Sequence, residues 1–92
     1  MAISGQKTIS TAGSAEPMGN QRIDGPLMVK ALTTNTDLAY LGNDGAGDVS
    51  SSNGLPLSAG DVVIFEWAGD LASIMVDVAV NGECVAWLAL DV

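Results

Sequence analysis

The residues most suggestive of chemistry lie in one run, GNDGAGDVSSSNGLPLSAGD, at positions 42–61. Asn43, Asp44 and Asp48 offer oxygens that calcium prefers, but calcium loops space these oxygens regularly and close with a distal glutamate, which this run lacks. A phosphate loop fits less well, because the run has no lysine and its glycines do not follow the order G-x-G-x-x-G. Asn, Asp and Gly tolerate left-handed backbone conformations. We therefore predict that residues 42–61 form turns that connect strands.

Residue types for catalysis are sparse in the rest of the chain. There is no histidine, so a nucleophile would need a carboxylate or a lysine as its base. Asp61 with Glu66, or Asp77 with Glu83, has the composition of a glycosidase dyad. However, outward carboxylates on a small sheet are usually solubilising, and 92 residues are few for a catalytic cleft. The sequence predicts no enzymatic activity and no cofactor.

Cysteine and chain length limit how the domain can be stabilised. Cys84 is the single cysteine, so an internal disulfide is excluded, and one thiolate without histidine cannot complete a tetrahedral zinc shell. Its apolar neighbours in the sequence predict a buried thiol. A domain of this size is marginally stable alone. Partner subunits are the expected source of additional stability.

The charge balance argues against two classes of partner. The formal net charge is −8, from eleven carboxylates against Lys7, Arg22 and Lys30. An acidic surface repels phosphate backbones and anionic lipid heads, so we expect neither nucleic acid nor a membrane as partner. The start, MAISGQK, lacks the apolar run of a signal peptide. We expect synthesis and initial use in the cytosol.

The elements that must position these residues are strands. Apolar, β-branched or alternating runs predict strands over 7–11, 27–32, 38–41, 62–67, 74–80 and 84–90. Pro17 and Gly19 predict an edge strand or a bulge within 16–23, and Asn81-Gly82 predicts a type I′ hairpin turn. The spacing predicts an all-β fold, a small antiparallel β-sandwich or jelly-roll-like barrel of about seven or eight strands. Residues 26–92 would form its core, and residues 1–25 an N-terminal arm or the first strands.

The alternation of side chains predicts which residues face the core. In 74–80, the expected inward residues are Ile74, Val76, Val78 and Val80, and the outward ones Met75, Asp77 and Ala79. In 62–67, Val63, Phe65 and Trp67 would fill the core and leave Val62, Ile64 and Glu66 outside. In 84–90, either Val85 and Trp87 or the set Cys84, Ala86, Leu88 and Leu90 must face outward.

Two strands therefore carry more apolar residues than one buried face needs. Contiguous exposed apolar surface usually marks an association site, although another segment of the chain could cover it. The candidate interface residues are Val62, Ile64, Glu66, Leu88 and Leu90.

The aromatic residues leave an alternative open. Trp67 and Trp87 lie in apolar strands, where core packing is the expected role of an indole. A different hypothesis is a small carbohydrate- or receptor-binding module that uses an exposed Trp87 or Tyr40 together with the acids of the 42–61 run.

The segment from Leu27 to Ala89 resembles small β-sandwich virion proteins of tailed bacteriophages. The resemblance is carried by LMVKALTTNTDLAYLGNDG, VSSSNGLPLSAGDVVIFEW and IMVDVAVNGECVAWLAL. The family's layout is a V-x-K-A-L strand, an N-T turn, a Y-[LV]-G-N strand, S-S-x-N-G-x-P-L, A-G-[DE] and a final [IV]-x-[VA]-D-x-x-V-N-G-E-x-V-x-[WY]-L-A. This chain follows that order, although its first strand reads V-K-A-L, with Val29 directly before Lys30. These pieces are strand and turn elements, so they specify the fold more than the role. The family has no catalytic residues to carry over.

This resemblance implies a structural part of a virion, assembled in the host cytoplasm. The expected role is capsid decoration, in which the chain cements the head shell through contacts with the major capsid protein or another virion protein. We expect a homo-oligomer, with a trimer favoured. A neck, tail or fibre component is the alternative within the same class.

Overall fold

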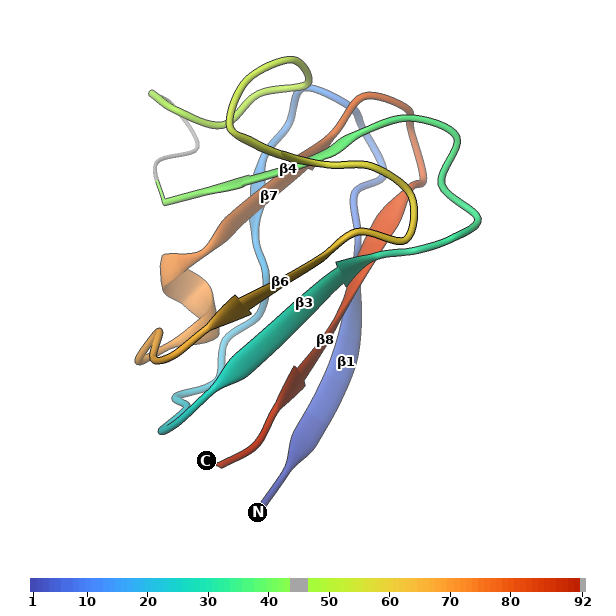
Figure 1. Cartoon of the computed structure of the whole chain (residues 1–92). Coiled ribbons are helices and arrows are strands. Elements are labelled where there is room, and N and C mark those ends of the chain that lie inside the picture. Colours follow the sequence, from blue (N-terminus) through green and yellow to red (C-terminus); the bar gives the residue numbers. More distant parts are fainter. Residues whose placement is uncertain (44–46, 92) are drawn as a thin grey trace.

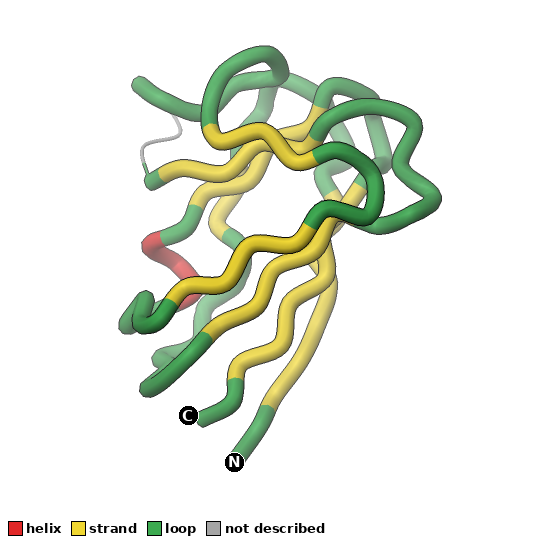
Figure 2. The backbone as a smooth tube through the Cα atoms, in the orientation of Figure 1, coloured by secondary structure: helices red, strands yellow, loops and turns green. Residues whose placement is uncertain are grey.

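The computed structural model describes residues 1–43 and 47–91, and these form two four-stranded antiparallel sheets (Figures 1 and 2). The all-β prediction is confirmed. The strands are β1 (Ile3–Thr8), β2 (Glu16–Pro17), β3 (Leu27–Ala31), β4 (Ala39–Gly42), β5 (Leu55–Leu57), β6 (Val62–Phe65), β7 (Met75–Val78) and β8 (Cys84–Ala89). One short 3₁₀ turn, η1 (Leu71–Ser73), precedes β7. No helix in the described part of the chain is long and apolar enough to span a membrane.

The strand pairs have the connectivity of a jelly roll. One sheet has the order β1-β8-β3-β6 and the other β2-β7-β4-β5. Strand β1 pairs with β8, β2 with β7, β3 with β6 and β4 with β5. These are the pairs of one long eight-stranded hairpin folded over on itself, and the further pairs β3–β8 and β4–β7 complete the two sheets. The first half of the chain is thus paired with the second half throughout.

The core lies between the inner faces of the two sheets. Strand β3 shows how the sequence sets this, because its burial alternates strictly and Leu27, Val29 and Ala31 are fully buried while Met28 and Lys30 are exposed. From the other sheet, Val76 and Val78 of β7 meet this layer. The two strands that contain proline, β2 with Pro17 and β5 with Pro56, both lie at sheet edges, where a missing N–H costs no ladder hydrogen bond.

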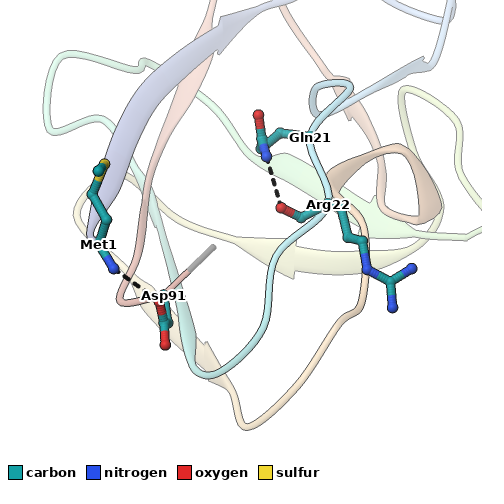
Figure 3. A network of polar contacts seen from close by, with 4 residues as sticks. All are labelled: Met1, Gln21, Arg22 and Asp91. Atoms are coloured by element: carbon teal, nitrogen blue, oxygen red, sulfur yellow. Dashed lines mark hydrogen bonds and ion pairs between the residues drawn. The ribbon is translucent and has the colours of Figure 1, made fainter.

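The N-terminal segment contributes two strands to the sandwich. Strand β1 runs from Ile3 to Thr8, earlier than the predicted 7–11, because its six residues pair along the whole of β8. The chain ends therefore lie side by side, and the N-terminal ammonium group of Met1 bonds Asp91 at 2.8 Å (Figure 3). On the inner face, Gly5 makes room for the indole of Trp87, since a Cβ added there would come within 2.8 Å of the ring.

Two predictions about connections are wrong. The run 42–61 is not all turn, because Leu55–Leu57 forms the edge strand β5 and buries Leu57. Asn81-Gly82 does not form a type I′ hairpin turn: Gly82 has a φ of 84°, but no non-glycine residue in the described chain has a positive φ. Strands β7 and β8 belong to different sheets, so this turn carries the chain from one sheet to the other.

Candidate functional site

The outer face of the β1-β8-β3-β6 sheet carries a row of exposed apolar side chains. Ile64 on β6 stands opposite Met28 on β3, which in turn stands opposite Leu88 on β8. Ile64 is 63% exposed, and the other two are about 40% exposed. Opposite residues in an antiparallel sheet have Cβ atoms roughly 5 Å apart. The three side chains therefore form one continuous strip across three strands.

Further apolar residues widen this strip into a patch. Leu90 is exposed beyond the end of β8, and its N–H donates to the carbonyl of Pro26 at 3.1 Å. Val62 is exposed one pleat further along β6, opposite Lys30. The sheet patch, as we call it, consists of Pro26, Met28, Val62, Ile64, Leu88 and Leu90. A shallow hollow of about 110 Å³ lies within it.

The sequence prediction located this patch in part. It placed Val62, Ile64, Leu88 and Leu90 outward, and the structure exposes all four. Glu66, which follows β6, is exposed as well. For β8 the structure selects the alternative in which Val85 faces the core. Met28, at the centre of the patch, was missed, although the alternation that directs Lys30 outward also places Met28 on that face.

The outer face of the β2-β7-β4-β5 sheet is covered by loops of the same chain. Asp77 was predicted to point outward into solvent, and this is wrong, since its exposure is 0%. Its Oδ1 accepts hydrogen bonds from the N–H of Gly13 at 3.0 Å and of Val78 at 2.8 Å. The loop that contains Gly13 also donates from Ala12 N–H to Asn81 Oδ1 at 2.7 Å. This loop therefore lies over the outward side of β7.

A second loop covers the neighbouring strand β4. Tyr40 is cross-strand partner of Asp77 and only 9% exposed. The chain at Gly54 approaches so closely that a Cβ there would lie 3.2 Å from the Cβ of Tyr40. Tyr40 is thus not available as an exposed binding aromatic. Val80, predicted to be inward, is 39% exposed because β7 ends at Val78.

Glu83 was grouped with the solubilising carboxylates, but it is buried and fastens a loop. It accepts hydrogen bonds from the N–H and the hydroxyl of Thr36 and from the N–H of Asp37. The bond from the Thr36 N–H is the main cause that lowers the pKa of Glu83 below its ordinary value, and burial opposes the shift. Its role in the fold is structural, and it forms no catalytic pair with Asp77 in the hydrogen bonds of the described residues.

The two tryptophans have different surroundings. Trp87 is partly buried and packs against the core, as predicted. Trp67 does not fill the core, because β6 ends at Phe65 and the chain turns away, leaving the indole 64% exposed. Cys84 is a buried free thiol, as expected.

The acidic run places no metal cluster in the described part of the structure. Asp44 lies outside the described residues, and in the rest of the chain no three acidic or cysteine side chains converge on a point. A cavity of about 330 Å³ opens between β4, β5 and β6, with Leu41, Leu55 and Phe65 among its lining residues. It adjoins Asn43 and Asp48 on either side of the undescribed residues.

Comparisons with protein-family models, with curated proteins and with solved structures found no match to this chain. The interpretation of function therefore depends on the surfaces described above.

Proposed function

We propose that this chain is a non-enzymatic structural protein of a tailed-phage virion. In this proposal it is a capsid decoration protein that forms a homo-oligomer, with a trimer favoured, and cements the head shell by binding the major capsid protein. The observation that carries the proposal is the sheet patch, a set of exposed apolar residues on a small domain that has no disulfide.

The physical requirements of a decoration protein fit this arrangement. A sheet face that none of the described loops covers can be buried against a second copy, and such burial stabilises a domain too small for a large core. Copies arrayed on a symmetric shell also gain avidity from repeated contacts. The −8 charge keeps the remaining exposed surface soluble and limits aggregation of decorated particles.

The fold supports the proposal at the level of analogy. Jelly rolls occur in viral capsid proteins, but also in lectins and cupins, so the connectivity alone does not choose among them. The resemblance of residues 27–89 to phage virion proteins favours the first of these classes.

The sheet patch is tested by adding one negative charge to it. We expect the wild-type protein to form a stable closed oligomer in light scattering over a range of concentrations. Ile64→Glu places a carboxylate in the apolar strip and should lower the measured mass to that of a monomer, with an unchanged circular dichroism spectrum. Gln6→Glu is the matched control, because it adds the same charge at an exposed position on the same face, on β1 and outside the patch.

Three results would count against the proposal. A wild-type protein that stays monomeric and does not co-sediment with head shells of its own phage would remove the basis for decoration. Equal effects of Ile64→Glu and Gln6→Glu would show that charge in general, and not the patch, controls association. A larger closed ring would instead favour a neck or tail subunit.

A further inference from the structure

A second exposed feature lies at the end of the sandwich, where two connections meet. Residues 21–24 lead from β2 toward β3, and residues 66–70 lead from β6 to η1. The N–H of Ile23 donates to the carbonyl of Gly69 at 3.0 Å, and the N–H of Leu71 donates to the carbonyl of Gln21 at 3.0 Å. These backbone bonds hold the two segments at a fixed distance from each other.

The indole of Trp67 is held flat on one of these segments. Gly69 has a φ of 79°, and a Cβ added there would lie 3.0, 3.2 and 3.5 Å from Cη2, Cζ2 and Cζ3 of the ring. Similar distances to three adjacent ring carbons mean that the ring face, rather than its edge, lies over Gly69. Because the side chain is nevertheless 64% exposed, the indole presents an open surface at a set position.

Polar residues line a hollow together with this ring. A hollow of about 340 Å³ is lined by Trp67 together with Gln21, Arg22, Ile23 and Asp24. The amide of Gln21 donates to the carbonyl of Arg22 at 2.8 Å, and the guanidinium of Arg22 extends away from the Met1–Asp91 pair (Figure 3). The residues that line the hollow thus carry one exposed indole, one amide, one guanidinium and one carboxylate.

We propose that this hollow is a saccharide-binding site. The apolar C–H face of a pyranose ring packs against an indole, and vicinal hydroxyls pair with planar side chains that carry two donors or two acceptors. Ligand sites combine an apolar surface with a few convergent polar groups in this way. Arg22 and Asp24 bring opposite charges to the same hollow, so the strongly acidic character of the chain does not exclude a neutral or an acidic sugar.

This site is separate from the sheet patch and does not depend on the decoration role. Of the two aromatic residues first considered for a sugar platform, Tyr40 is buried and Trp87 is partly buried. Trp67 meets the same chemical requirement at a different place. The expected ligand is therefore a sugar residue of a polysaccharide or glycan, bound at the end of the sandwich where Trp67 is exposed.

The test uses the full chain and a printed array of bacterial surface oligosaccharides. The strongest ligand is then titrated against Trp87→Phe, in which Trp67 is the single remaining tryptophan, so that indole fluorescence reports this site. We expect a change in Trp67 emission on binding. Calorimetry should show about a tenfold loss of affinity for Trp67→Ala and a smaller loss for Arg22→Ala. Gln6→Ala, exposed on β1 and outside both the hollow and the sheet patch, should bind as wild type does.

Several outcomes would overturn the proposal. The array could give no binding, or Trp67→Ala could retain the wild-type affinity. A proline-rich peptide that shifts the Trp67 emission when no saccharide does would assign the indole to a protein partner. Asp24→Asn is a second variant for the case in which Trp67→Ala does not fold. It keeps the indole in place and should still weaken binding of the same sugar.

Discussion

The outward faces of the two sheets differ in what covers them. On the β2-β7-β4-β5 sheet, loops around Gly13 and Gly54 lie over Asp77 and Tyr40, and both are buried. On the β1-β8-β3-β6 sheet, Cys84 is the buried exception among the outward residues, whereas the residues of the sheet patch are exposed, with Ile64 the most exposed of them. In the described part of the chain, loops thus cover the middle of one face and leave the other face open at the sheet patch. The difference indicates that the open face is the one available to partners.

The largest expected effect follows from shortening an outward residue on each face. Tyr40→Ala removes a covered aromatic side chain and should lower the free energy of unfolding by about 3 kcal/mol. Ile64→Ala, on the open face, should change the free energy of unfolding of the isolated subunit by less than about 0.5 kcal/mol. Urea unfolding of both variants at concentrations where the protein is monomeric measures the contrast. Equal losses would mean that the two faces are equally covered.

An intermediate effect is expected where a loop is fastened to the covered face. Asp77→Ala leaves the N–H groups of Gly13 and of the buried Val78 without this acceptor, at a cost of about 2 kcal/mol. Hydrogen exchange should also become faster at Gly13. Asp77→Asn keeps one oxygen as acceptor and is expected to retain protection there. If exchange at Gly13 is unchanged in Asp77→Ala, the carboxylate does not hold the loop.

The smallest expected effect is a dependence of stability on pH that arises at Glu83. Its pKa is lowered in the folded protein from an ordinary value near 4.5. The folded state thus favours the ionised form, so this contribution is complete above pH 4.5 and is lost as the pH falls through the folded pKa.

Glu83→Gln should flatten this part of the stability profile, measured as the urea midpoint between pH 6 and pH 3. Thr36→Ala is the variant for comparison, because it keeps the N–H that is the main cause of the lowered pKa of Glu83 and loses only the hydroxyl. It should retain most of the pH dependence. An unchanged profile in Glu83→Gln would assign the acid sensitivity to other carboxylates.

The fold was largely accessible from sequence because strand alternation is a local property. LMVKA sets the burial of β3 without reference to any other segment, and the excess apolar residues of 62–65 predicted an exposed face. The errors concern ends and turns. β1 was placed too late, since pairing with β8 sets its limits, and β5 was missed because Leu55-Pro56-Leu57 is too short and too interrupted to read as a strand.

The candidate site was predicted only in part. Val62, Ile64, Leu88 and Leu90 were identified as outward, but no local pattern groups them with Pro26 and Met28, which join them through the pairing of β3 with β6 and β8. Trp67 was predicted to fill the core, and its exposed position contradicts this. This position depends on β6 ending at Phe65 and on the contact of the indole with Gly69.

The sequence by itself determined the all-β class and most of the strands, the inward residues of β3, the lack of a disulfide and the apolar surplus of β6 and β8. Each of these depends on residue type or on the alternation of side chains between the two faces of a strand. The tertiary structure decided the jelly-roll pairing and which outward residues are covered. Asp77, Tyr40 and Glu83 are buried because loops distant in sequence reach over them. Ile64 and Trp67 stay exposed because no described segment does so, and coverage of this kind is a long-range property that no local pattern records.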